Sequence, residues 1–428
     1  MASGLNYVLY GLLVAGALAF SRFEMRSWGT ARTPFAFIVY PFLAVLTLAV
    51  FVAPHLGFFP LHARTLVVFG FYFALLAAAS GIYRNLATEG ATAPGPPSPP
   101  PGEGPSIGTL EYGFLCVLLV ALFAGDLLGG GDAAPLEKGE LAVGGLRGHV
   151  MEIGVAYLVI ALSQGGGARA ARALFVGLIL WVLTVNQVKY PILIPLAGSA
   201  LYRWASGRLA TWKLAVAGAM VPLLIVASVY GFLGAGAPEL DAASSPQIAE
   251  FVVEHTLGYV LAGVLGFDQL LAHLRIPWLD LDGVTYVLAP FVNLGRLLVS
   301  SLHYFNPVNS QYFDIHTNGT IDSNVFTLFG SLAFRGGWVL ASFTTIAFGA
   351  VTYWIWARWW LTVGALASAA GTYWIATAML SWFDPYFPSL STIEIVGFLW
   401  LRAAVAGAET PFRVATHSPP EPTDPGSS

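Results

Sequence analysis

Long uninterrupted apolar blocks are the feature that most constrains this chain. They recur along the 428 residues, and most are about 17–23 residues long, the length at which a helix spans a hydrocarbon core of ~30 Å. Because lipid offers the backbone no hydrogen-bond partners, such segments must be helical. They lack the alternation of apolar and polar residues found in membrane barrel strands. The chain is therefore predicted to be an all-α, polytopic integral membrane protein.

Composition excludes several other classes of protein. Only 10% of the residues are charged, against about 25% in a soluble domain, so the chain cannot cover a water-facing surface. The net charge of -4 argues against a nucleic acid partner. The sequence has no phosphate-binding Gly-x-x-x-x-Gly-Lys loop, no Cys/His cluster and no His-Glu-x-x-His motif, so we predict no metal and no cofactor.

The apolar blocks predict about eleven transmembrane helices and one large outer loop. The predicted spans cover 5–20, 35–53, 65–83, 110–128, 150–164, 172–187, 190–202, 212–234, 336–356, 361–381 and 389–405. The chain is accordingly divided into N-terminal helices (1–84), a Pro/Gly-rich cytoplasmic linker (85–108), central helices (109–234), a periplasmic loop with active-site helices (235–335), C-terminal helices (336–408) and a disordered cytoplasmic tail (409–428).

The distribution of lysine and arginine predicts the orientation in the membrane. Basic residues gather in alternate short connections, for example Arg203, Arg208 and Lys213. Since cytoplasmic connections carry the excess of positive charge, the N-terminus is predicted to be periplasmic and the C-terminus cytoplasmic. This orientation places the long loop outside the cytoplasm.

Helices are predicted within the outer loop. Gln247–Leu261 has the pattern of an amphipathic helix, and Phe267–Leu274 continues a helical pattern. The stretch 284–303 is almost long enough to span, but Pro290 and Arg296 interrupt it. We predict that it is one helix lying in, or dipping into, the outer leaflet.

Polar residues of that stretch share one helical face. Asn293, Arg296, Ser300 and His303 follow the spacing i, i+3, i+7, i+10, and Tyr286 lies seven residues before Asn293. At about 100° per residue they form one narrow stripe. An apolar helix with such a stripe must turn it toward water, protein or a charged ligand.

Two segments resemble the Wzy-type polymerases of bacterial surface polysaccharides, also called oligosaccharide repeat unit polymerases. Thr285–Leu294 is similar to an aromatic–Pro–Asn-Leu stretch of that family's large outer loop, and Asp322–Trp338 resembles its Asn-Val-(Tyr/Phe)-Thr…Gly segment. The basic residue in Asn186–Pro191, Lys189, also fits the family pattern. The family more often has an acidic residue where this chain has Arg335.

The resemblance implies a fold and a reaction. The expected architecture is that of a GT-C-like membrane glycosyltransferase in the bacterial inner membrane. The expected reaction transfers a growing glycan from undecaprenyl diphosphate onto a fresh lipid-linked repeat unit, without a metal and with inversion, to make O-antigen, capsule or exopolysaccharide. The expected partners are the lipid-linked oligosaccharide, membrane lipid, a chain-length regulator and a flippase, with no nucleic acid.

Such a reaction needs a base for the attacking hydroxyl and cations for the departing diphosphate. The candidate bases are His303, His316, Asp314 and Asp322. The candidate diphosphate ligands are Arg296, Lys189, Arg147 and Arg335. The candidate sugar contacts are Asn293, Ser300, Tyr286 and Asn324.

Other functions remain open at the level of sequence. An O-antigen ligase would share the donor and the architecture but would transfer to a lipid A core. A transporter or precursor flippase would need paired charges at the membrane midplane, and the sequence has few. A scaffold would leave the polar stripe unexplained.

Overall fold

In the part of the chain that it describes, the computed structural model is all-α apart from one short pair of strands. It describes residues 4–88, 108–127, 145–163, 169–185, 190–211, 213, 245–299, 305, 311–319, 321–360 and 365–405. The helices are α1 (Gly4–Trp28), α2 (Pro34–Thr47), α3 (Ala63–Thr88), α4 (Thr109–Leu127), α6 (Gly145–Ser163), α7 (Arg169–Val185), α8 (Tyr190–Ala205), α11 (Ser245–His273), α12 (Asp282–Val287), α13 (Ala289–Leu298), α14 (Leu328–Ile355), α15 (Ala365–Met379) and α16 (Leu390–Val405). The strands are β1 (Phe313–Asp314) and β2 (Asp322–Ser323).

Short π and 3₁₀ turns extend three of these elements. A π turn, η1 (Leu48–Val52), and a 3₁₀ turn, η2 (Ala53–Leu56), prolong α2. A π turn, η3 (Trp356–Trp360), follows α14, and a 3₁₀ turn, η4 (Leu380–Trp382), follows α15.

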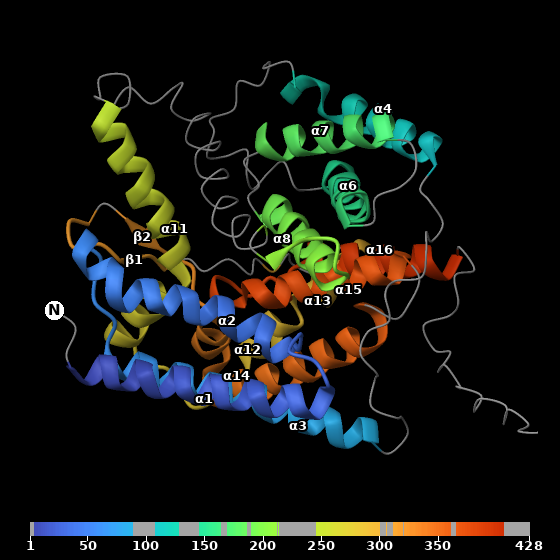
Figure 1. The fold of residues 1–428 in the computed structure, drawn as a ribbon. Helices are drawn as coiled ribbons and strands as arrows, with labels where there is room; N and C mark the ends of the chain where they lie inside the picture. The colour runs from blue at the N-terminus through green and yellow to red at the C-terminus, as the bar shows by residue number, and fades with distance from the viewer. Residues whose placement is uncertain are drawn as a thin grey trace, which may run out of the picture.

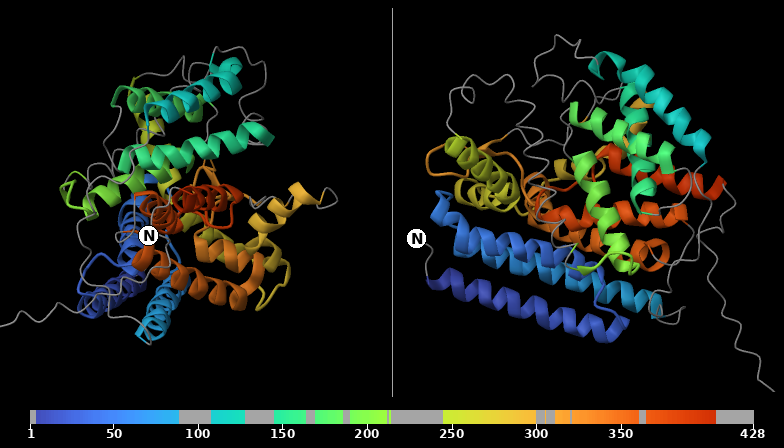
Figure 2. Two further views of the ribbon diagram at one scale, coloured as in Figure 1. Left: turned by 90° about the vertical axis from the view of Figure 1, so that its right-hand side faces the viewer. Right: turned by 45° about the horizontal axis from the view of Figure 1, so that its top comes forward.

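The helices pack in three neighbouring groups (Figure 1). In the first, α3 packs against α1 and α14, and α2 lies beside them. In the second, α15 packs against α8 and α16, and α6 packs against α8 and α16. The third group is the pair α4 and α7, which lies on the side away from α1 in Figure 1 and in both views of Figure 2.

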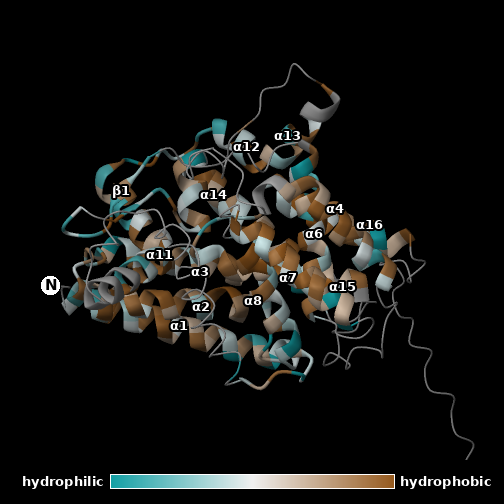
Figure 3. Cartoon of the chain, turned by 90° about the horizontal axis from the view of Figure 1, so that it is seen from above, coloured by the Kyte–Doolittle hydropathy of each residue, from teal (hydrophilic) through white to brown (hydrophobic). Residues whose placement is uncertain are grey.

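Five described helices are long and apolar enough to cross a membrane. They are Gly4–Trp28, Pro34–Leu56, Ala63–Leu86, Leu146–Ser163 and Leu328–Arg358. Only 17% of the apolar window in the first is buried inside the protein, so most of that helix must face lipid. Figure 3 shows hydrophobic residues along most of the helices and hydrophilic ones in connections such as that around β1. The chain is therefore an integral, multi-pass membrane protein.

The prediction of about eleven spans is too high for the helices that the structure describes. Every predicted span falls on a helix except 212–234, of which the structure describes only Lys213. However, α7, α8, α15 and α16 have only 17, 16, 15 and 16 residues. At about 1.5 Å per residue, such helices fall short of a hydrocarbon core of ~30 Å.

The outer-loop helices differ from their prediction in two ways. The patterns predicted at Gln247–Leu261 and Phe267–Leu274 form one helix, α11. The predicted single helix 284–303 is instead two, α12 and α13, which break at Leu288–Ala289, and α13 ends at Leu298. Pro290 explains the break, because it supplies no backbone N–H and is favoured in a first helical turn.

A sharp bend in α14 forms backbone hydrogen bonds with the segment that precedes α12. Gly337 has φ +74° and ψ 175°, a conformation that is essentially restricted to glycine. The Trp338 N–H donates to Pro277 O at 3.2 Å, and the Asp280 N–H donates to Gly336 O at 3.0 Å. This end of α14 and segment 277–283 are therefore joined through their backbones.

A buried carboxylate joins α1, α3 and α14 at the other end of the first group. Glu24 is fully buried and accepts hydrogen bonds from Thr33 Oγ1, Ser80 Oγ (2.6 Å) and the Tyr353 hydroxyl. Burying a carboxylate costs free energy unless hydrogen-bond donors of the protein replace the water that would solvate it. Three donors from three parts of the chain satisfy this requirement.

Tyr353→Phe is expected to destabilise the protein by about 1–3 kcal/mol, because it removes a hydrogen bond to a buried acid. The measurement is the thermal midpoint of the purified protein in detergent. Tyr7→Phe, on the exposed N-terminal part of α1, is the matched control and should leave the midpoint unchanged. Equal midpoints for all three proteins would show that the Tyr353 hydroxyl contributes nothing.

Candidate functional site

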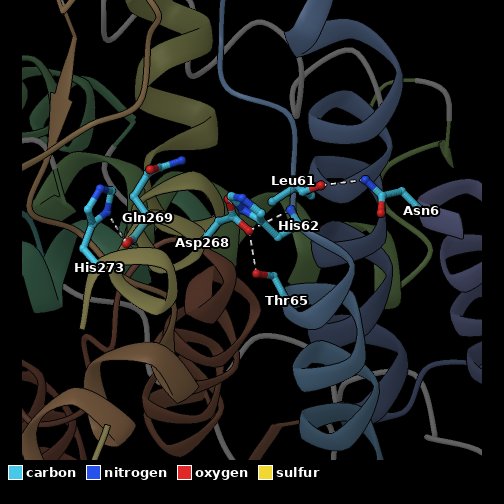
Figure 4. Close-up of polar contacts among 7 residues, drawn as sticks. All are labelled: Asn6, Leu61, His62, Thr65, Asp268, Gln269 and His273. Carbon is cyan, nitrogen blue, oxygen red and sulfur yellow. Dashed lines mark hydrogen bonds and ion pairs between the residues drawn. The ribbon is translucent and has the colours of Figure 1, made fainter. Parts of the chain in front are cut away.

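A histidine and a buried aspartate form a pair between α3 and α11. Asp268 is fully buried, whereas the side chain of His62 is 52% exposed. His62 Nδ1 lies 2.8 Å from Asp268 Oδ2, and the His62 backbone N–H donates to Oδ1 at 2.9 Å. Thr65 Oγ1 also donates to Oδ1. Figure 4 shows the aspartate reaching from α11 to the first residues of α3.

The surroundings fix both members of the pair. Asp268 lies where α3 begins, and the positive end of a helix favours an anion. On the other side, Asn6 Nδ2 of α1 donates to Leu61 O at 2.7 Å (Figure 4). Leu61, the residue before His62, is thus tied to α1.

This geometry suits proton transfer at the exposed face of the ring. The hydrogen-bond network assigns the proton of neutral His62 to Nδ1, since that nitrogen faces a carboxylate. Nε2 is then the acceptor, and no described residue is its partner. A histidine oriented by a buried aspartate is the arrangement of a general base.

The start of Asp322–Trp338, one of the two segments that carry the family resemblance, packs against α11, the helix that holds Asp268. Ser323 Oγ donates to Ala262 O at 3.1 Å, and the Thr327 N–H donates to Gly263 O at 3.3 Å. A Cβ on Gly266 would lie 2.4 Å from Val325 O, so glycine is required for this close approach. The start of this segment, residues 322–327, therefore lies along α11 within about two turns of Asp268.

Arg335 and Tyr286, both predicted from the sequence, lie together in the structure. The Arg335 guanidinium carbon is 5.7 Å from the centre of the Tyr286 ring. Burial, and then the charge of Asp384, raise the pKa of the Tyr286 hydroxyl, while Arg335 lowers it. Burial also raises the pKa of Asp384 to about 7. A cation, a tyrosine and an acid thus come from three separate stretches of the chain.

His316, a predicted base, ties the strand pair to the α2–α3 connection. Its Nε2 lies 2.9 Å from Leu56 O, and its Nδ1 contacts Asn318 Oδ1. The ring stands edge-on to Phe58, with the ring centres 4.9 Å apart. Gly57 has φ +84°, and a Cβ there would lie 2.5 Å from Nε2. Both ring nitrogens already have partners, which gives His316 a structural role.

Asp314 and Asp322, the two predicted acids, face each other across the strands. They are direct partners in the antiparallel pair β1–β2, and both are exposed. The hydrogen bond with Asp314, burial and the Asp314 charge together raise the pKa of Asp322 above 3.8. The folded protein therefore favours protonated Asp322. The stability that this contributes is present below pH 3.8 and is lost as the pH rises through the raised pKa.

Asp314→Asn is expected to stabilise the protein near neutral pH by about 0.2–1 kcal/mol, since like charges directly opposite are unfavourable. The gain should disappear in acid, where wild-type Asp322 is protonated. Thermal midpoints of both proteins across the pH range test this. A gain that is the same at every pH would exclude charge repulsion as its cause.

The predicted polar stripe is not one helical face. Asn293 binds the backbone of Phe305 twice, through Nδ2 to the carbonyl and Oδ1 to the N–H, each at 2.9 Å. Tyr286 belongs to α12 rather than α13. Arg296 lies in α13, but its side chain is outside the part of the chain that the structure describes, as are Ser300 and His303. The stripe failed as a prediction because the helix ends at Leu298.

The remaining candidates are dispersed. Arg147, at the start of α6, lies over the ring of Phe123, 4.6 Å from its centre. Asn324 follows β2 and is half-buried, and Lys189 lies outside the described residues. Sequence reasoning missed His62 and Asp268, although an aspartate within the apolar run Leu257–Leu271 was a signal that a partner must exist.

A family model matches residues 128–408, more than half of the chain. The chain belongs to DUF6337, a family of unknown function. The DUF6337 region contains α6 to α16 and therefore Asp268, Tyr286 and Arg335, whereas His62 precedes it. No curated protein and no solved structure matches the chain. DUF6337 carries no assigned activity, so the resemblance to polysaccharide polymerases remains a prediction.

Proposed function

We propose that this protein polymerises undecaprenyl-diphosphate-linked oligosaccharides at the periplasmic face of the bacterial inner membrane. The observation that carries the proposal is the His62–Asp268 pair, an exposed base oriented by a buried acid. One of the two segments similar to Wzy-type polymerases, Asp322–Trp338, packs on the helix that bears Asp268. It also contacts the other segment, Thr285–Leu294, through Arg335 and Tyr286.

His62 would act on the acceptor sugar. Its Nε2 accepts the proton of the attacking hydroxyl as the oxygen bonds to the anomeric carbon of the growing glycan. The bond from that carbon to the diphosphate oxygen breaks, and the lipid diphosphate leaves with the electron pair. A single displacement of this kind inverts the anomeric centre.

Arg335 would act on the leaving group. A guanidinium matches the oxygens of a phosphate better than an ammonium does, and negative charge grows on the diphosphate as its bond breaks. Arg335 lies in α14 immediately before the Gly336–Gly337 bend, close to the start of an apolar span. That depth suits a substrate whose polyprenyl tail stays in the bilayer.

The location of His62 also fits a lipid-linked substrate. It immediately precedes α3, whose apolar span is Ala63–Leu86. The exposed ring therefore lies at the boundary between the span and the connection, where a diphosphate headgroup would lie. A soluble nucleotide sugar would not require this depth.

The experiment is a deletion of the gene in its host, complemented with wild type or Asp268→Asn at matched expression. Lipid-linked and surface glycans are then separated by size. Single repeat units in the deletion, a ladder restored by wild type, and no ladder with Asp268→Asn are the expected results. Full-length glycan that stays on its carrier would indicate a ligase instead. Unchanged glycan in every strain would exclude both enzymes and favour transport.

A further inference from the structure

A second polar cluster lies inside the bundle, apart from His62 and Asp268. It is centred on Glu152 of α6, which is 3% exposed. Neither carboxylate oxygen of Glu152 meets the geometry of a hydrogen bond, and neither does the buried hydroxyl of Tyr373 on α15. Buried polar groups are almost always paired, and an acid inside a membrane protein marks a functional site by default.

The groups around Glu152 come from the helices packed against α6. Ser391 and Glu394 of α16 are its polar neighbours, and Tyr373 lies close enough to interact with it electrostatically. Tyr190 of α8 contacts Ser391, with the two hydroxyl oxygens 3.3 Å apart. Four helices thus direct oxygen atoms toward one region of the core.

A graded series of side chains leads from the surface to this acid. His149 lies one turn before Glu152 on α6, and its side chain is 40% exposed. Its Nδ1 is 3.2 Å from a carboxylate oxygen of Glu394, whose side chain is 22% exposed. The charge of Glu394 in turn interacts electrostatically with Glu152. Exposure therefore falls along His149, Glu394 and Glu152, as a path for an ion from the surface requires.

We infer that Glu152 is a buried proton-binding site that exchanges protons with the surface through Glu394 and His149. The site needs a ligand that can enter a packed core, and a proton needs no cavity. Among the described residues, no three His, Cys, Asp or Glu side chains are grouped closely enough to hold a metal ion. Protonation also gives the Glu152 carboxyl a donor, which it can share with Ser391 or Tyr373.

The charged groups on the other neighbours of α6 lie elsewhere. Arg147 is on α6 itself, over Phe123. On α4 and α7, Tyr112 interacts with Glu111 and Arg172, and Glu111 pairs with Arg402 at the far end of α16. Tyr386 interacts with both Tyr190 and Tyr373. The described groups facing Glu152 are therefore Glu394, Ser391 and Tyr373, and His149 lies on the far side of Glu394.

The test uses infrared difference spectra of the full-length protein in lipid nanodiscs between acidic and alkaline buffer. A protonated buried carboxyl gives a C=O band of its own, and this band should titrate in wild type and be lost in Glu152→Gln. Glu394→Gln should shift the pH midpoint of that band, because it removes the charge that interacts with Glu152. Glu24→Gln is the matched control, since Glu24 is buried but already has three donors; it should leave the Glu152 band in place.

A second measurement keeps the inference falsifiable if Glu152→Gln does not fold. Dicyclohexylcarbodiimide adds intact to protonated carboxyls inside lipid, and mass spectrometry locates the adduct in the wild-type protein. Labelling at Glu152 should be lost as the pH rises. A difference spectrum unaffected by Glu152→Gln, or labelling at Glu152 that is absent or independent of pH, would overturn the inference. Neither measurement depends on the proposed polymerase activity.

Discussion

His62→Gln is expected to lower polymer formation by about 10²–10⁴-fold, the range over which a general base contributes to a reaction. Glutamine keeps a polar side chain of similar reach but cannot accept and release a proton. The His62 backbone N–H still donates to Asp268 in the variant, so α3 and α11 should remain joined. The measurement is the rate of chain extension by the purified protein with a lipid-linked repeat unit.

His273→Gln is the matched control for this variant. His273 is an exposed histidine at the end of α11, the helix that bears Asp268, but its Nδ1 bonds to the Gln269 carbonyl at 2.9 Å rather than to an acid. It should retain the wild-type rate. Asp268→Asn should resemble His62→Gln, because an amide N–H facing Nδ1 would favour the other ring tautomer. Full activity of His62→Gln would remove His62 from the reaction and leave the pair a structural link.

Gly337→Ala is expected to cause the largest loss of stability. The glycine-only backbone conformation costs alanine about 1–3 kcal/mol. The new Cβ would also lie 2.7 Å from Pro277 O and 2.8 Å from Trp278 C, and overpacking of this kind costs a further ~1–3 kcal/mol. The neighbour is backbone, so it cannot rotate away. A lower thermal midpoint and a lower yield of folded protein in detergent would confirm the effect.

Gly397→Ala provides the comparison for Gly337→Ala. Gly397 lies in α16 and is exposed, and a Cβ added there would meet no atom within 4 Å. Alanine is favoured over glycine in a helix by about 1 kcal/mol, so this variant should be neutral or slightly stabilised. If the two variants have the same midpoint, the bend at Gly337 does not constrain the fold.

The sequence predicted the helices well because apolar block length is a local property. Each described predicted span falls on a helix, and α1, α2 and α3 begin within two residues of the predicted starts, although α1 extends eight residues beyond its predicted end. The number of spans was wrong because a block can be apolar throughout and still be too short, as in α15 with its 15 residues. Burial against other helices, rather than lipid, accounts for such blocks.

The site was less predictable because its contacts are distant in sequence. His62 and Asp268 are 206 residues apart, and neither stands in a motif. Arg335 and Tyr286 were found because a family resemblance covered both of them. The polar stripe failed at Leu298, where the helix ends, since helical spacing is meaningful only while the helix continues.

The separation of these partners has a consequence for biosynthesis. Asp268 emerges from the ribosome 206 residues after His62, and Tyr353 emerges 329 residues after Glu24. The first three helices must therefore enter the membrane with the His62 amide and part of the Glu24 carboxylate still lacking their final partners. The hydrogen bonds at both ends of the three-helix group form only after Asp268 and Tyr353 have been synthesised. An N-terminal fragment that stops before α11 would keep both ends open, which makes it a natural substrate for membrane quality control.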